Sequence, residues 1–277
     1  MIAADRLGLG IDPNSTLSVA DIVECTRVAE AKGFATTWVA EGRRGDAFVL
    51  LSALAINTSR IRLGAGVLPI LVRSPWVVAT ATATVDEISD CRFMLGLGAG
   101  HKSVIEDRHG LSYDRPTIRM REVADIVRQA LTGEEVNFEG EIFRLSGAQL
   151  SRRPVRSDVP VYIAGIGPRV LELAGEIADG AFLIFPTERN LRTSCDISLT
   201  VRRARAGTQK RSMLWPMFSL VLRPNGRRQS SRRGERSRIS AGCLITVVSL
   251  HRKDFRGKRQ HSGMPGSRMT KRGQCAP

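Results

Sequence analysis

The chain of 277 residues lacks the segments and motifs that mark several protein classes. No run of about 18 apolar residues occurs, so we expect no membrane-spanning helix. The amino-terminal stretch has no basic segment followed by an apolar run and a small-residue cleavage site, so we expect no secretory signal. The motifs HExxH and GxSxG and the P-loop are also missing, so no motif supports a metal or a covalent-nucleophile mechanism. We predict no metal site.

Cysteine is sparse and unpaired along the sequence. The five cysteines are odd in number, form no CxxC pair and fit no zinc-binding spacing; they are Cys25, Cys91, Cys195, Cys243 and Cys275. Scattered reduced thiols are typical of cytosolic proteins. We therefore expect free thiols and a cytoplasmic location.

Acidic residues are nearly absent from the last part of the chain. Residues 1–200 carry 22 Lys/Arg and 25 Asp/Glu, a net of −3, whereas residues 201–277 carry 20 Lys/Arg and only two acids, a net of +18. The overall charge of +15 therefore describes the tail. We predict a folded domain over 1–200 and an atypical, basic, poorly ordered segment over 201–277. Nucleic-acid binding is disfavoured, because this segment lacks the aromatic residues of a base-stacking platform.

Apolar runs and helical patterns alternate over the first 185 residues. Six runs are typical of buried strands, at residues 7–11, 36–40, 61–67, 92–98, 160–165 and 180–185. Helical patterns separate them, at residues 18–33, 46–55, 74–88, 119–131 and 168–177, and a small hairpin is expected over 136–145, turning at 139–140. This alternation predicts parallel βα units. Both a doubly wound sheet and a (β/α)8 barrel fit; a barrel would take its last two strands from 213–222 and 243–250.

Glycine gathers at three of the predicted strand ends, in Gly64–Gly66, Gly96–Gly100 and Gly165–Gly167. Ligands meet a parallel α/β fold at the carboxyl ends of its strands, where backbone without a Cβ can approach a ring or a phosphate. Tight turns needed for barrel closure explain any single cluster about equally well. Three clusters together favour a ligand.

Charged residues also follow two of these strands. Glu41, Arg43 and Arg44 come after the second strand, and His101 and Lys102 follow the fourth. Such groups could transfer protons or bind an anion. A solvated charged loop is the competing interpretation for the first set, and an ordinary loop hydrogen bond is the competing interpretation for His101. We expect Trp38 and Trp76 to be core residues.

Several ordered motifs resemble the luciferase-like oxidoreductase superfamily, in particular its branch that uses the deazaflavin coenzyme F420, typified by methylenetetrahydromethanopterin reductase. The motifs are Gly33–Glu41, Thr58–Val67, Thr84–Ser89, Arg92–His101 and Leu171–Gly180. The resemblance covers about residues 7–186. It implies a (β/α)8 TIM barrel, which we expect to be incomplete or irregular at strands seven and eight, and an enzyme that transfers a hydride between F420 and an organic substrate.

The same resemblance implies the site residues. Ala65, Gly66 and Val67 would form a bulge against the deazaflavin ring, with a cis peptide at Gly66–Val67. Gly98, Gly100 and His101 would line the cofactor, and Ala164, Gly165 and Gly167 would lie at its phosphate. Glu41 and His101 are the implied catalytic residues. FMN, with oxygen as co-substrate, is the alternative cofactor, and a homodimer is possible.

Two departures from the family pattern stand out. Asp90-Cys91 occupies a turn where the family usually has Gly-Gly, and Asp tolerates a positive φ better than most residues. The basic tail replaces the acidic helices that family members continue with. This change suggests a shifted reading frame, and hence the alternative that the chain is an inactive remnant of such an enzyme.

Overall fold

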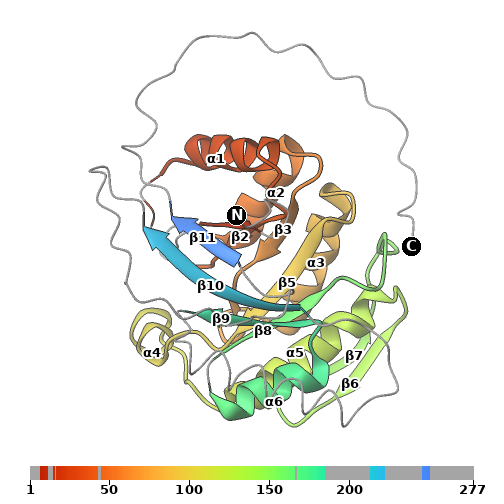
Figure 1. Cartoon of the computed structure of the whole chain (residues 1–277). Helices are drawn as coiled ribbons and strands as arrows, with labels where there is room; N and C mark the ends of the chain where they lie inside the picture. Colours follow the sequence, from red (N-terminus) through yellow and green to blue (C-terminus); the bar gives the residue numbers. More distant parts are fainter. Residues whose placement is uncertain are drawn as a thin grey trace.

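A ring of eight parallel strands forms the centre of the molecule (Figure 1). The computed structural model describes residues 7–11, 15, 17–42, 45–165, 167–184, 213–221 and 245–249. Around the ring lie β1 (Gly8–Ile11), β2 (Thr36–Val39), β3 (Arg62–Ala65), β5 (Phe93–Gly98), β8 (Val161–Ala164), β9 (Gly180–Ile184), β10 (Met213–Val221) and β11 (Ile245–Ser249). Pairing of β3 with β5 and of β11 with β1 closes the ring. The barrel prediction is confirmed, and the doubly wound sheet is excluded.

The seventh and eighth strands, β10 and β11, come from the two tail segments predicted as strand candidates. The ring is irregular there, as predicted. β11 and β1 share a single register pair, Gly8 with Val247, whereas β1 and β2 share four. Pro216, in the middle of β10, has no N–H to donate to a neighbouring strand. The predicted boundary at residue 200 and the remainder of the basic segment lie outside the described residues.

Helices follow the strands and pack around the ring. They are α1 (Val19–Ala31), α2 (Ala47–Asn57), α3 (Pro75–Ile88), α4 (Lys102–His109), α5 (Pro116–Leu131) and α6 (Pro168–Ile177). The capping box of Ser18 with Asp21 opens α1, and Ser74 accepts the Val77 N–H at the start of α3. The sequence patterns predicted neither α4 nor the short strand β4 (Leu68–Pro69).

A small antiparallel hairpin interrupts the ring between α5 and β8. Its strands are β6 (Val136–Glu139) and β7 (Arg144–Ala148), so the turn consists of the four residues 140–143 and is longer than the predicted turn at Glu139-Gly140. The buried carboxylate of Glu122 on α5 fixes this turn by accepting the N–H groups of Glu141, Ile142 and Phe143. A side-chain acceptor from another element thus replaces the tight turn that the sequence suggested.

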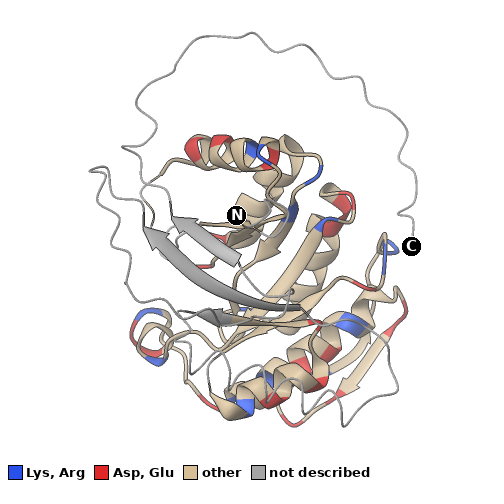
Figure 2. Ribbon diagram, viewed as in Figure 1, with Lys and Arg blue, Asp and Glu red and all other residues tan. Residues whose placement is uncertain are grey.

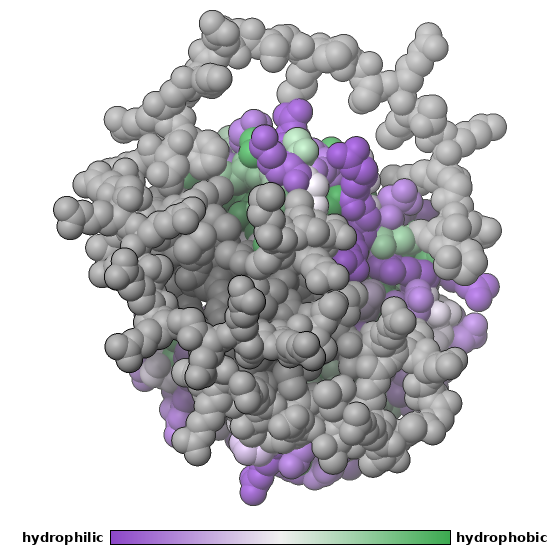
Figure 3. All heavy atoms as spheres, in the orientation of Figure 1, coloured by the Kyte–Doolittle hydropathy of each residue, from purple (hydrophilic) through white to green (hydrophobic). Residues whose placement is uncertain are grey.

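Two apolar clusters fill the protein. The larger lies between the ring and its helices, and the smaller, inside the ring, contains Trp38, Met94, Tyr162, Ala164 and Phe182. Trp38 is 1% exposed and its indole lies edge-on to Tyr162, with ring centroids 5.3 Å apart. Trp76 packs against the larger cluster, so both tryptophans are core residues as predicted. On the face shown in Figure 3, the described side chains along the lower rim are mostly hydrophilic.

The turn before β5 has the conformation that the family pattern implies. Asp90 and Cys91 have φ of 56° and 59°, the left-handed region that glycine adopts without cost. Cys91 is disulfide-bonded, so the expectation of free thiols is wrong for this residue, whereas Cys25 is a buried free thiol. None of the described helices is both long and apolar enough to cross a membrane.

Candidate functional site

The carboxyl ends of three neighbouring strands, β3, β5 and β8, lie side by side. We call the residues there the strand-end surface: Ala65–Val67, Gly98, Ala164 and Gly165. Gly98 pairs with Ala164 in register, and the position of a Cβ on Gly98 lies 2.7 Å from Val67 Cγ2 and 3.6 Å from Ala164 Cβ. Gly165 donates its N–H to the Phe182 carbonyl on β9 at 3.4 Å. Residues predicted from three separate motifs therefore lie side by side.

The bulge Ala65–Val67 is attached to the end of β2 by its backbone. The Gly66 N–H donates to the Val39 carbonyl at 2.8 Å, and the Glu41 N–H donates to the Val67 carbonyl at 3.2 Å. The Gly66–Val67 peptide is cis, as the resemblance implied. Ala65 and Gly66 are buried and Val67 is half-buried. Val67 packs against the aromatic cluster inside the ring, so the bulge covers one side of this cluster.

Packing accounts for most of the strand-end glycines. A Cβ on Gly96 would lie 2.1 Å from the Ala65 carbonyl oxygen, and one on Gly165 would lie 2.5 Å from Val170 Cγ1. Gly167 is the exception, because a Cβ there would meet nothing within 4 Å and its φ of −81° suits any residue. At the other glycines, neighbouring residues approach so closely that a side chain would not fit, whereas open space remains at Gly167.

Gly167 is also the N-cap of α6, and no side chain caps this helix. Pro168 has no N–H, and the Val170 N–H donates to the Gly167 carbonyl, which leaves the Arg169 N–H free of any intrahelical partner at the helix start. A helix N-terminus carries partial positive charge and unsatisfied donors, both of which favour an anion such as a phosphate. The open space and the uncapped helix end therefore coincide.

His101 lies at the rim of this surface. It is the N-cap residue of α4, it is exposed, and its side chain makes no cap hydrogen bond. Gly100 before it has a φ of 74°, which turns the chain away from β5. The imidazole is therefore accessible from solvent at the end of β5, one turn from the Gly98 position.

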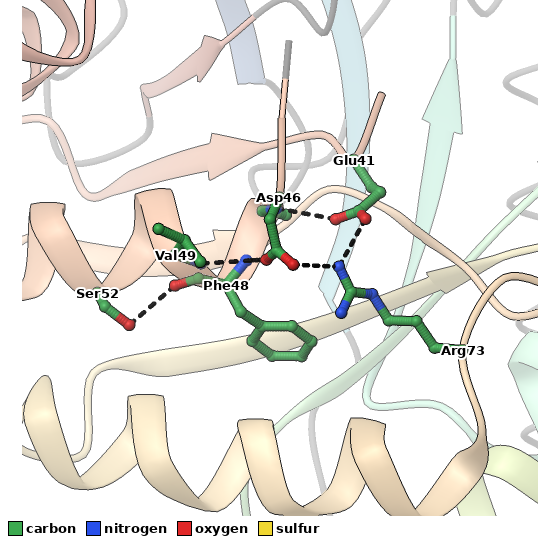
Figure 4. Close-up of polar contacts among 7 residues, drawn as sticks. Glu41, Asp46, Phe48, Val49, Ser52 and Arg73 are labelled. Atoms are coloured by element: carbon green, nitrogen blue, oxygen red, sulfur yellow. Dashed lines mark hydrogen bonds and ion pairs between the residues drawn. The ribbon is translucent and has the colours of Figure 1, made fainter. Parts of the chain in front are cut away.

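Glu41 is not a free carboxylate. One of its oxygens accepts the Ala47 N–H at 2.8 Å, and the other accepts from the guanidinium of Arg73 at 2.6 Å (Figure 4). The same Arg73 nitrogen donates to Asp46 at 2.6 Å, and the guanidinium carbon lies 5.5 Å from the centre of the Phe48 ring. The solvated loop considered for Glu41 is thus replaced by a half-buried ion-pair network.

The network shifts the pKa of two of its members, Asp46 and Arg73. Burial alone would raise the pKa of Asp46, but Arg73 and the Val49 and Phe48 N–H groups lower the pKa below the ordinary 3.8. Burial would likewise lower the pKa of Arg73, yet hydrogen bonds to Asp46 and Glu41 raise this pKa above its ordinary value. Asp46 and Arg73 therefore stay charged across the physiological pH range.

The motif analysis did not find Arg73. Its position directly before the helix-starting Ser74-Pro75 was the available signal, because this places a cation at the same strand edge as Glu41. Arg43 and Arg44 lie outside the described residues. Among the described residues, no group of three or more His, Cys, Asp or Glu side chains could hold a metal ion.

Comparison with known proteins gives consistent results. The profile of the luciferase-like monooxygenase family matches residues 3–213. The 5,10-methylenetetrahydromethanopterin reductase of Archaeoglobus fulgidus is 39% identical over 158 residues, covering 57% of this chain and 47% of that protein. The F420-dependent glucose-6-phosphate dehydrogenase of Amycolatopsis mediterranei is 33% identical over 173 residues, covering 58% of this chain and 52% of that protein.

A solved structure shares the fold. The coenzyme F420-dependent tetrahydromethanopterin reductase of Methanopyrus kandleri superposes with a TM-score of 0.71 at 24% identity, covering 78% of this chain and 66% of that chain. The chain spans about half the length of the curated relatives it matches.

Proposed function

From the premise that the chain belongs to the luciferase-like monooxygenase family, we propose that it binds coenzyme F420 and transfers a hydride between F420 and an organic substrate. The strand-end surface would face the deazaflavin ring, and the start of α6 would hold the phosphate. When bound, the coenzyme supplies the two-electron chemistry, and the protein supplies orientation, electrostatics and exclusion of water.

The observation that carries this proposal is the open, uncapped start of α6 at Gly167. Every other glycine of the site except Gly100 has a packing reason, whereas at Gly167 both the space and the donors are unused. Sequence relatives include an F420-dependent dehydrogenase, which favours F420. FMN remains the alternative cofactor, because a helix N-terminus binds either phosphate.

Each site residue then has a distinct task in the proposed enzyme. Ala65–Val67 and Gly98 have no polar side chain, which suits contact with the face of a ring. His101 is exposed at the rim, where its imidazole can serve as the general acid or base of the reaction. Glu41 has both oxygens occupied by Arg73 and Ala47, so we propose that its first task is to hold the loop after β2.

The test is titration of the full-length protein with F420 and, in parallel, with FMN, followed by absorbance and fluorescence. We expect saturable binding of F420, tighter than that of FMN. Tighter binding of FMN would support the alternative cofactor. Binding of neither would contradict the proposed function and support the interpretation that the chain is an inactive remnant.

The matched variant is Gly167→Ala. A methyl group fits without a clash and the backbone angles suit alanine, so we expect unchanged or slightly raised stability. If the phosphate lies at the start of α6, the same methyl group should weaken F420 binding several-fold. Unchanged affinity in this variant would place the phosphate elsewhere while leaving cofactor binding itself intact.

We also propose that residues 1–200 form the main part of the enzyme domain and that the basic segment 201–277 is an atypical part of the chain, although it supplies β10 and β11 to the ring. The proposed partner is a small organic substrate and not a nucleic acid. The change in net charge from −3 to +18 supports this division. Resequencing the locus and translating all three frames tests the frameshift idea. If no other frame restores an acidic, helix-patterned continuation, that idea is wrong.

A homodimer through α2 and α3 is the proposed assembly. Val49 and Ile56 on α2 are 70% and 74% exposed, and Val77 and Ile88 on α3 are 47% and 37% exposed. α2 contains no charged residue, and Figure 2 shows both helices almost free of charge until the end of α3. Two copies could therefore meet here without like charges opposing each other.

Light scattering of the wild type and of Ile56→Lys tests this assembly. We expect a dimer that becomes a monomer when a charge is introduced on α2. Val19→Lys is the control, because Val19 is 54% exposed on α1, and it should remain dimeric. A monomeric wild type would contradict the proposal.

A further inference from the structure

We propose that Arg73 is a positioning residue for the bulge Ala65–Val67: its guanidinium fixes the loop after β2, and this loop fixes the bulge. The inference rests on the proposed function in one respect, that the bulge faces the cofactor ring. The side-chain hydrogen bonds of Arg73 go to Glu41 and Asp46, so any effect of Arg73 on the bulge is transmitted through these residues.

The first step is the bridge that Arg73 makes between two carboxylates. Its Nη2 lies 2.6 Å from Glu41 Oε1 and 2.6 Å from Asp46 Oδ2. The side chains of Arg73 and Glu41 are only 17% and 16% exposed, and the Phe48 ring covers one face of the guanidinium (Figure 4). Limited solvent access makes such a charge-assisted contact stronger than a surface ion pair.

The second step is closure of the loop that carries Glu41. Glu41 Oε2 accepts the Ala47 N–H at 2.8 Å, and Gly42 and Gly45 pair with each other across the loop. Asp46 caps α2 by accepting the Phe48 N–H at 2.8 Å. Both ends of the loop are therefore attached to the start of α2, and Arg73 joins both carboxylates to the segment before α3.

The third step runs from this loop to the bulge. Ala65, Gly66 and Val67 have no polar side-chain atom, so their position depends on packing and on backbone hydrogen bonds. Two of those bonds connect the bulge with the end of β2 and the residue that follows it. The Gly66 N–H donates to the Val39 carbonyl, and the N–H of Glu41, whose side chain is anchored by Ala47 and Arg73, donates to the Val67 carbonyl. Movement of the loop after β2 would thus move the surface proposed to meet the ring.

Loss of the positive charge should open this arrangement. Without Arg73, the carboxylates of Glu41 and Asp46 would face each other with no cation between them, and their repulsion would favour separation of the loops. A neutral side chain at either carboxylate would relieve the repulsion. The arrangement therefore predicts a specific rescue, which a purely structural role of Arg73 would not produce.

The experiment compares wild type with Arg73→Gln, Arg73→Lys and the double variant Arg73→Gln with Asp46→Asn. Asn is as good an N-cap as Asp, so the second change preserves the start of α2. Arg119→Gln is the matched control, because Arg119 also pairs with a carboxylate, Asp114, and lies over a phenylalanine ring, far along the chain from the bulge.

Two readouts apply to each variant: hydrogen exchange of the Glu41 and Gly66 amides, and the dissociation constant for F420. For Arg73→Gln we expect exchange and dissociation constant to rise about tenfold, the effect of losing one charged hydrogen bond. Arg73→Lys and the double variant should recover most of the loss, and Arg119→Gln should match wild type.

Wild-type exchange at Glu41 and Gly66 in Arg73→Gln would overturn the proposal, as would equal exchange in the single and double variants. If wild type fails to bind F420, the proposed function is wrong, yet the exchange of these two amides still decides whether Arg73 positions the bulge. If Arg73→Gln does not fold, the double variant decides in its place: a folded double variant with near-wild-type exchange at Glu41 and Gly66 supports the proposal, and any other result overturns it.

Discussion

The two edges of the barrel use their polar groups in opposite ways. At the amino-terminal edge, side chains satisfy backbone groups: the guanidinium of Arg92 donates to the carbonyls of Ala55, Thr58, Ile61 and Ser89. At the carboxyl-terminal edge, α4 and α6 begin without a side-chain cap. The first edge stabilises the fold, and the second leaves backbone donors for a ligand, the division expected of a (β/α)8 barrel.

The contrast is sharper within the carboxyl-terminal edge itself. α1, α2 and α3 are each capped, by Ser18, Asp46 and Ser74. The uncapped helix starts lie on the side of the ring formed by β5 and β8, where Gly98 and Ala164 meet. Among the residues that the structure describes, this part of the edge combines uncapped helix starts with Gly98 and Ala164, which have no polar side chain. This combination is the reason for proposing that the phosphate-bearing cofactor binds here.

The largest expected effect is at Arg92. In Arg92→Met, four carbonyls lose a charged donor, and each such hydrogen bond contributes about 1.5–3 kcal/mol. Since some of these carbonyls can accept a hydrogen bond from water instead, we expect the free energy of unfolding to fall by about 3 kcal/mol. Chemical denaturation measures this change. The affinity of the folded fraction for F420 should stay at the wild-type value. A loss of affinity without a loss of stability would contradict the assignment of Arg92 to the edge that stabilises the fold.

Gly98→Ala tests the opposite edge. The added Cβ would lie 2.7 Å from Val67 Cγ2, so the bulge has to shift. Overpacking of this kind costs about 1–3 kcal/mol, and the displaced surface should weaken cofactor binding more strongly than Gly167→Ala does. Calorimetry of both variants with F420 measures this. Equal affinities in the two variants would show that the bulge is not part of the binding surface.

The dependence of stability on acid pH tests the contribution of Glu30 at the amino-terminal edge. Burial alone would raise the pKa of this carboxyl, but three backbone N–H groups, of Ile61, Arg60 and Ser59, hold it below 4.5. A depressed folded-state pKa gives stability that is present above the unfolded value and is lost as the pH falls through the folded value. Glu30→Gln should therefore be less stable than wild type at pH 7.

The difference between Glu30→Gln and wild type should shrink below about pH 4.5. Urea denaturation between pH 3 and pH 7 measures it, with F420 affinity at pH 7 as the check on the other edge. A constant difference across this range would mean that the carboxylate charge does not contribute at the amino-terminal edge.

The smallest effect is expected at Asp90, whose φ is 56°. Gly adopts this region without the steric cost that a side chain bears. Asp90→Gly should stabilise the protein by less than about 1 kcal/mol, because Asp tolerates the left-handed region and Gly gains entropy in the unfolded chain. Thermal melts resolve such a shift, and a lower melting temperature would contradict the strain argument.

Local sequence signals predicted the elements with strong periodicity or caps. Ser74-Pro75 located the start of α3, and Gly167-Pro168 located that of α6, because these residues act within one helical turn. α4 was missed, since an eight-residue helix of polar and charged residues has almost no apolar stripe. The hairpin turn was misplaced, because its acceptor, Glu122, comes from another element.

The sequence by itself determined the βα order, the positions of most caps, the glycine-rich strand ends and, through resemblance, the cis Gly66–Val67 peptide. These features are encoded within a few residues of chain. Only the tertiary structure decided that Glu41 is paired with Arg73 and that Val67 leaves no room for a side chain at Gly98. The same holds for the open space beside Gly167, which the other described glycines of the strand ends lack. Each of these depends on residues brought together by closure of the ring, and distance along the chain carries no information about such contacts.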